Sequence, residues 1–166
     1  MPSRFRRAVL HASIAVPSSL FAVLPAYAVL GGSPMQTPSG ATATTSSSVA
    51  RAAATGSSTS SSSSYSVIET TLETGTVVRE YVTTSGTVFG IAWSGPQIPN
   101  LSDLLGGYFP QFASGVAASH TAGVRGPASV EASGLVVHSA GHMGSFFGQA
   151  YVPSALPSGV SSSDIK

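Results

Sequence analysis

Two histidines, His138 and His142, are the residues best placed for chemistry, and they lie four apart in VVHSAGHMGSFFG. On a helix this spacing puts both imidazoles on one face, where they can bind a metal ion. Here they flank an Ala-Gly corner, where a hairpin could also bring the rings together, and Glu131 or His120 would have to supply a third ligand. Two isolated histidines at this spacing do not identify a metal site by themselves. We therefore expect turn and sheet histidines and assign no metal, cofactor or catalytic residue, and His138 and His142 are kept as candidates.

The sequence gives weaker support to other sets of catalytic residues. A Ser-His-Asp triad can be written from many serines, either histidine, and Asp103 or Asp164, but the chain has no Gly-x-Ser-x-Gly elbow. The glutamates between residues 69 and 80 share one expected strand meander, where solvation or pairing with Arg79 is the simpler interpretation. The glycine-bearing stretches lack the lysine of a phosphate-binding loop.

Charge is scarce: 8% of the 166 residues are charged, against about 25% in a typical soluble domain. Three of the seven basic residues are Arg4, Arg6 and Arg7, so the chain beyond residue 28 has four basic against six acidic residues, a balance of −2. Nucleic-acid binding needs clustered Lys and Arg, and we expect none. Cysteine is absent, which excludes disulfides, thiolate metal sites and a cysteine nucleophile.

The first 28 residues have the three parts of a signal peptide. Arginines come first, an apolar run from Ile14 to Leu24 follows, and Ala26-Tyr27-Ala28 has the small-x-small form of a cleavage site. The apolar run has eleven residues and is interrupted, whereas a membrane span needs about twenty. We predict cleavage after Ala28 and an exported protein, periplasmic or secreted, with no membrane span after cleavage.

Residues 29–64 are rich in Ser, Thr and Ala, and this low-complexity composition predicts a disordered linker. From Tyr65 the composition changes, and residues 65–166 are expected to form one compact domain. YSVIETTL, TVVREYVT and TVFGIAW are strand-like runs separated by Thr-Gly and Ser-Gly corners. A three-residue first loop sets Glu69 opposite Arg79, which avoids the like-charged Glu69–Glu80 pair of a two-residue turn. A two-residue turn at the second corner pairs Val82 with Phe89, Val78 with Trp93, and Tyr81 with Gly90.

One helix is expected between two sets of strands. Asn100 or Ser102 can cap it, Leu101, Leu104, Leu105, Tyr108 and Phe112 recur at helical spacing, and residues 113–127 look like a loop. Three further runs follow, ASVEA, GLVVHSA and HMGSFFGQAYVP, with corners at Ser133-Gly134 and Ala140-Gly141. The order predicts an α+β fold of antiparallel β-meanders, about six strands, with the helix packed on the sheet. The alternative is a small β-barrel.

The fragments GTVVREYV, IAW, RGP, LVVHS, GHM and AYVP, in this order, resemble a family of exported proteobacterial proteins, domain of unknown function 2844. The resemblance runs from about Gly75 to Ile165, with a short match at VLGG, and the Ser-rich residues 41–64 depart from it. It implies export and one compact domain. The family has no assigned activity, so the resemblance implies no functional residue.

Residues 144–152 are the expected contact for a partner. GSFFGQAYV has no charge, and an unguarded edge strand pairs readily with another strand. Phe146, Phe147, Gln149 and Tyr151 are therefore candidates for binding an envelope protein or a second copy of the chain. The alternative is a central strand buried on both faces.

Three functions remain open. The first is a non-enzymatic accessory or binding module of the cell envelope, which the export signal, the low charge and the lack of a catalytic signature favour. The second is a small periplasmic hydrolase or metal-dependent enzyme that uses His138 and His142. The third is a surface or adhesive protein displayed on its Ser-rich segment.

Overall fold

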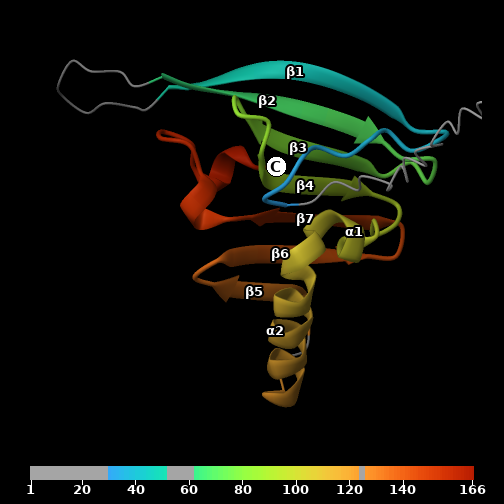
Figure 1. The fold of residues 1–166 in the computed structure, drawn as a ribbon. Coiled ribbons are helices and arrows are strands. Elements are labelled where there is room, and N and C mark those ends of the chain that lie inside the picture. Colours follow the sequence, from blue (N-terminus) through green and yellow to red (C-terminus); the bar gives the residue numbers. More distant parts are fainter. Residues whose placement is uncertain (1–29, 52–61, 124–125) are drawn as a thin grey trace, which may run out of the picture.

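A computed structural model describes residues 30–51, 62–123 and 126–166, and these form one antiparallel sheet with a helical segment (Figure 1). The strands are β1 (Thr42–Arg51), β2 (Ser62–Thr71), β3 (Val77–Thr83), β4 (Val88–Gly95), β5 (Ala128–Ala132), β6 (Leu135–His142) and β7 (Ser145–Tyr151). Their order across the sheet is β1-β2-β3-β4-β7-β6-β5. The expected α+β fold is confirmed. The barrel alternative is wrong, because β1 and β5 are separate edges of an open sheet.

The seventh strand, β1, lies where the sequence predicted a disordered linker. It pairs with β2 in an unbroken register from Thr42↔Thr71 to Arg51↔Ser62. The disorder prediction relied on the lack of apolar residues in this segment. Backbone pairing does not require apolar side chains, and threonine is favoured in strands, so a Ser/Thr-rich segment can still form one. The expected signal peptide, residues 1–28, and linker residues 52–61 lie outside the described residues.

Charge predicted the register of the first hairpin, β2–β3, correctly. Glu69 lies opposite Arg79, and Gly75 has a φ of 81°, the left-handed conformation that the three-residue loop requires. In the second hairpin Val78 faces Trp93 and Tyr81 faces Gly90, as expected. The expected Val82–Phe89 pair is wrong: Val82 pairs with Val88. A bulge at this point shifts the register, because one extra residue on β4 opposes a single residue of β3.

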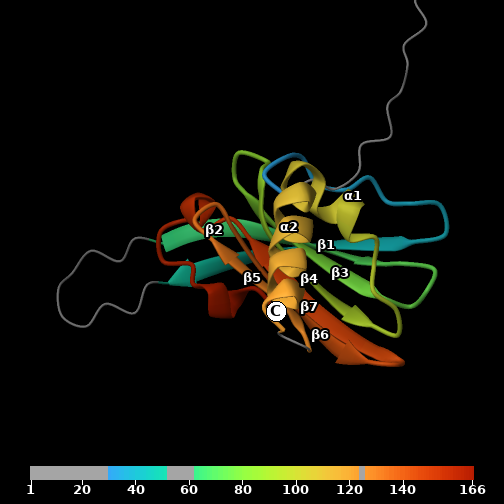
Figure 2. The same cartoon turned by 90° about the horizontal axis from the view of Figure 1, so that it is seen from below.

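The helical segment of 21 residues comprises α1 (Leu101–Leu105), the 3₁₀ turn η1 (Gly106–Tyr108) and α2 (Phe109–Thr121). The side chain of Asn100 caps its start by accepting from the Ser102 N–H. The loop expected from residue 113 is wrong as far as Thr121. The Ala-containing run 113–118 continues the helix, and Gly115 lets α2 approach β5, since a Cβ at Gly115 would lie 2.7 Å from a methyl of Val130. Figures 1 and 2 show α2 beside the β5 end of the sheet.

The last hairpin turns three residues later than expected. The corner is Met143-Gly144 rather than Ala140-Gly141, with Gly144 at a φ of 83° and His142 opposite Ser145. The strand β7 lies inside the sheet, between β4 and β6, so residues 144–152 do not form the edge on which the expected partner contact depended.

The two faces of the sheet are covered differently. On one face α1 and α2 pack with residues of the N-terminal segment, and this core contains Leu30, Leu105, Ile91, Val137 and Phe112. On the other face the segment after β7, with the 3₁₀ turns η2 (Pro153–Ala155) and η3 (Ser162–Asp164), packs on Tyr81, Phe89 and Ala92. This C-terminal segment, residues 153–166, ends over β3 and β4, so the same face of β7 and β6 is left open.

Candidate functional site

The open face of β6 and β7 presents an alternating set of side chains. Gln149 lies opposite Ala92 on one side and His138 on the other, and Phe147 lies opposite Ala140. Because side chains alternate between the faces of a strand, these residues share the face on which the C-terminal segment packs. Phe147 is 56% exposed although β7 is a central strand. The expectation that this run is buried on both faces is therefore also wrong.

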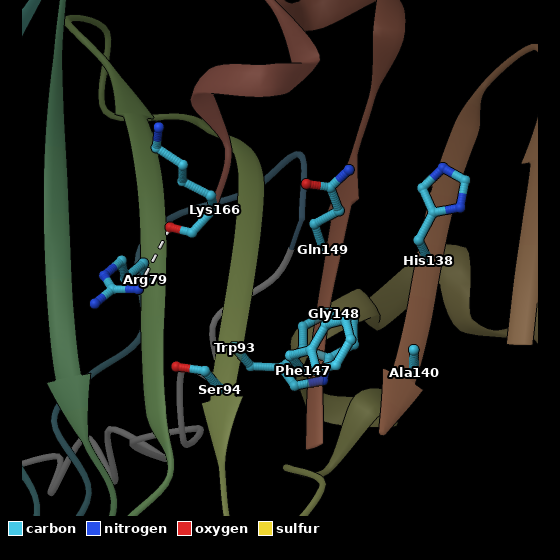
Figure 3. A pocket seen from close by; sticks show the side chains of 9 residues that line it. All are labelled: Arg79, Trp93, Ser94, His138, Ala140, Phe147, Gly148, Gln149 and Lys166. Carbon is cyan, nitrogen blue, oxygen red and sulfur yellow. Dashed lines mark hydrogen bonds between the residues drawn. The ribbon is translucent and has the colours of Figure 1, made fainter. Parts of the chain in front are cut away.

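A groove of about 380 Å³ lies on this face, between the C-terminal segment and β6 (Figure 3). Its lining comes from four strands and the end of the C-terminal segment: Arg79, Trp93, Ser94, His138, Ala140, Phe147, Gly148, Gln149 and Lys166. Its lining is mainly apolar, with Phe147 and Ala140 among the contributors, while Gln149, His138 and Arg79 supply polar groups. Pockets with such a composition bind small molecules through apolar contacts and a few hydrogen bonds.

Gly148 leaves room for Trp93 behind the groove. It lies opposite Trp93, and the indole occupies the space on the helix-covered face where a side chain of residue 148 would be. A Cβ at this position would overlap Cζ2 of Trp93 and lie 2.6 Å from the carbonyl oxygen of His138. Trp93 is 2% exposed, and its Nε1 has no hydrogen-bond partner among the described residues.

The end of the C-terminal segment is held in place by Tyr81. Its hydroxyl donates to the Lys166 carbonyl oxygen at 2.8 Å and accepts from the Lys166 N–H at 3.0 Å. A tyrosine is protonated near neutral pH and can donate, and burial raises the pKa of Tyr81 further in the same direction. Arg79 donates from Nη1 to the same carbonyl at 3.4 Å and from Nε to Glu69 at 2.8 Å. One wall of the groove is thus fixed by contacts between positions more than eighty residues apart.

His138 contacts two side chains of the neighbouring edge strand β5. Its Nδ1 lies 2.9 Å from the Ser129 hydroxyl, and its Nε2 lies 3.7 Å from Oε1 of Glu131. The side chain of Glu131 is 71% exposed, so water screens this carboxylate. The arrangement has the residue types of a Ser-His-Glu triad, but its carboxylate is beyond hydrogen-bond distance.

The two candidate metal ligands are not brought together. His138 and His142 lie on the same strand, β6, where four residues span roughly 13 Å. The idea that a corner between them could join the rings is wrong, because the corner follows His142. The Nδ1 of His142 lies 3.2 Å from the Met143 carbonyl oxygen, and His120 lies at the exposed end of α2. In the part of the chain that the structure describes, no three His, Asp or Glu side chains gather as a metal site.

The four expected partner-binding residues divide between the faces. Phe147 and Gln149 line the groove, and Tyr151 packs in the cluster under the C-terminal segment. Phe146 faces the helix side, where it lines a second hollow of about 440 Å³ with the half-exposed Ile98. Side chains alternate between the two faces along the strand from Ser145 to Tyr151. This alternation alone would have placed Phe147 and Gln149 on one face and Phe146 on the other. The contributions of Arg79, Trp93 and Lys166 were missed, because they depend on the strand order.

No helix within residues 30–51, 62–123 and 126–166 has the length and apolarity to cross a membrane. The model of a family described as "Protein of unknown function (DUF2844)" matches residues 26–165, which is most of the chain. No curated protein and no solved structure matches the chain.

Proposed function

The chain belongs to the family of proteins of unknown function 2844, and we propose that it is a non-enzymatic binding module of the cell envelope. In this proposal the groove around Phe147 holds the ligand. The carrying observation is a phenylalanine that is 56% exposed at the centre of a sheet, beside a groove of about 380 Å³. A large apolar side chain in this position gains stability when a ligand removes it from water.

The lining supports a ligand with a flat apolar group and a polar end. The ring of Phe147 and the small residues Ala140 and Gly148 offer an apolar surface without projecting side chains. The amide of Gln149 both donates and accepts hydrogen bonds, and the His138 ring lies at the same margin. The guanidinium of Arg79 is already paired with Glu69, so its charge is largely balanced. We therefore propose an uncharged or weakly anionic amphipathic molecule rather than a highly charged one.

Binding can be followed with N-phenyl-1-naphthylamine, an uncharged aromatic dye. Trp93 is the single tryptophan and lines the groove, so energy transfer from Trp93 to the dye reports binding to the protein, and variants locate the site. We expect Phe147→Ala to weaken binding about tenfold, since burying one large apolar side chain is worth about 1.5–3 kcal/mol and 1.4 kcal/mol is a factor of ten.

Met143→Ala is the matched control, because Met143 is 93% exposed in the β6–β7 turn and outside the groove lining. We expect this variant to bind the dye as the unchanged protein does. The proposal fails if the unchanged protein does not bind the dye, or if Phe147→Ala and Met143→Ala bind it equally well.

The envelope location rests on the N-terminal arginines, the apolar run and the Ala-Tyr-Ala sequence. We predict that the protein expressed from the full chain is recovered in the periplasm and begins at Val29. Recovery of uncleaved protein in the cytoplasm would contradict this. Recovery outside the outer membrane would instead favour the surface or adhesive function.

A hydrolase is the second candidate, favoured by the contacts of Ser129 and Glu131 with His138. In that chemistry His138 would take the proton of the Ser129 hydroxyl as it attacks an ester carbonyl. The exposed and distant carboxylate of Glu131 is a poor group to orient the ring. Hydrolysis of p-nitrophenyl acetate by the unchanged protein, lost in both Ser129→Ala and His138→Ala, would establish this candidate. Equal rates in all three proteins would exclude Ser129 and His138 as its catalytic pair.

A further inference from the structure

The polar side chains of the groove lie in one row across the sheet. Arg79 and Gln149 lie on either side of Ala92, and His138 lies opposite Gln149 on the next strand. The end of the C-terminal segment lies over the same row, because the Lys166 carbonyl oxygen accepts from Nη1 of Arg79. The row therefore brings a guanidinium, an amide and an imidazole together with the lysine that ends the segment.

An apolar row lies next to the polar one. Phe147 precedes Gln149 by two residues on β7 and lies opposite Ala140, so the two rows are roughly 7 Å apart along the strands. Figure 3 shows the side chains of Lys166 and Gln149 toward one end of the groove, and those of Phe147 and Ala140 toward the other. The groove thus has a polar end and an apolar end.

The charges of the polar end favour an anion. The lining includes Arg79 and Lys166 but no Asp or Glu, although acidic residues outnumber basic ones beyond residue 28. Glu69 pairs with Arg79 at 2.8 Å, and Glu131 lies 3.7 Å from His138. In the part of the chain that the structure describes, no ion pair involves the ammonium group of Lys166. One unbalanced cation in the lining matches one negative charge on a ligand.

We propose that the groove selects small molecules in which a flat apolar group carries a single carboxylate. This inference rests on the binding function proposed above and specifies its ligand. The apolar group lies on Phe147, and the carboxylate accepts from the amide of Gln149 and pairs with the ammonium of Lys166, whose flexible stem can follow it. A volume of about 380 Å³ is at the lower end of the roughly 300–1,000 Å³ typical of small-molecule sites, which favours a small ligand over a protein segment.

Equilibrium dialysis with 2-naphthoate and 2-naphthamide tests this preference, because the second ligand replaces the carboxylate with an uncharged amide. We expect 2-naphthoate to bind about fivefold more tightly, the largest factor typical of a solvent-exposed ion pair. In Lys166→Gln we expect similar affinities for the two ligands, and the substitution leaves the backbone bonds to Tyr81 in place. Lys166→Arg restores the positive charge, and we expect it to restore the preference for the carboxylate.

Ser133→Glu is the control for net charge. Ser133 is exposed in the β5–β6 turn and outside the groove lining, and this substitution lowers the net charge by one, as Lys166→Gln does. We expect it to keep the preference of the unchanged protein. If neither ligand binds the unchanged protein, the binding function of the groove fails together with this inference. If both ligands bind it equally, or if Lys166→Gln keeps the full preference, the carboxylate ligand is overturned while binding in the groove stands.

Discussion

At the scale of single residues, the carboxyl group of Glu80 has the most unusual environment. It is fully buried on β3, its Oε1 accepts from the Met35 N–H at 2.8 Å, and its Oε2 has no hydrogen-bond partner among the described residues. Burial raises its pKa above the ordinary glutamate value, and the bond from Met35 opposes this shift. Glu80 thereby connects the N-terminal segment to the sheet through a group whose charged form is disfavoured.

The raised pKa of Glu80 predicts how stability depends on pH. Between its unfolded pKa and its higher folded pKa, the folded protein binds more protons than the unfolded chain. The free energy of unfolding therefore falls as pH rises through this window, and this contribution is constant above it. In Glu80→Gln, which keeps an acceptor for Met35, the contribution disappears. Urea unfolding at a series of pH values should show the unchanged protein losing stability relative to Glu80→Gln as pH rises.

Glu73→Gln is the control for this experiment, because Glu73 is exposed in the β2–β3 turn. We expect it to keep the pH dependence of the unchanged protein. A stability difference between the unchanged protein and Glu80→Gln that stays constant or grows in favour of glutamate with rising pH would contradict the assignment.

At the scale of elements, the C-terminal segment determines how much of the sheet face stays open. Ile165 is fully buried against Gly90, where a Cβ would lie 2.7 Å from its Cδ1, and Tyr81 binds the backbone of Lys166. The bulge in β4 supports this packing, because Phe89 belongs to the same cluster as Tyr81 and Ile165. The segment is therefore part of the core on this face and also a wall of the groove.

Tyr81→Phe removes both hydrogen bonds to Lys166. We expect a loss of about 1–3 kcal/mol in the free energy of unfolding, because the Lys166 backbone groups lose their partner. Amide exchange at Lys166 should become faster. Tyr151→Phe, a half-buried tyrosine of the same cluster, is the control. Unchanged exchange at Lys166 in Tyr81→Phe would show that the hydroxyl does not hold the segment.

Local rules predicted most elements and one register from the sequence. Like-charge repulsion between Glu69 and Glu80 selected the β2–β3 register, and the capping side chain of Asn100 marked the start of the helix. The errors came where tertiary contacts decide. Helix α2 continues past residue 113 because it packs on β5, and the last hairpin turns at Gly144, so the Ala140-Gly141 corner was a wrong choice between two glycines.

The site was predicted in part. Phe147 and Gln149 were identified because the run has no charged residue to guard an edge, but the run does not form an edge. Its place inside the sheet follows from β7 pairing with β4, whose partner residues lie between 51 (Gly95 and Phe146) and 61 (Gly90 and Tyr151) residues apart along the chain. Local sequence rules do not predict that pairing. The wall that Lys166 contributes depends on the same long-range arrangement.

At the scale of the whole molecule, the sheet separates two surfaces that do not overlap. The groove lies on the face of β7 and β6, whereas β1 forms the edge at the far side of the sheet order. The helices cover the opposite face, so ligand binding at the groove does not require them to move.

The most direct test of groove binding is a titration of the ¹⁵N-labelled protein with N-phenyl-1-naphthylamine, followed by amide chemical shifts. We predict that the largest shifts map to Phe147, Gly148 and Gln149 on β7, to His138 and Ala140 on β6, and to Lys166, and that β1 stays unchanged. Shifts confined to the helix-covered face, or no shifts at saturating dye, would contradict ligand binding on the open face of the sheet.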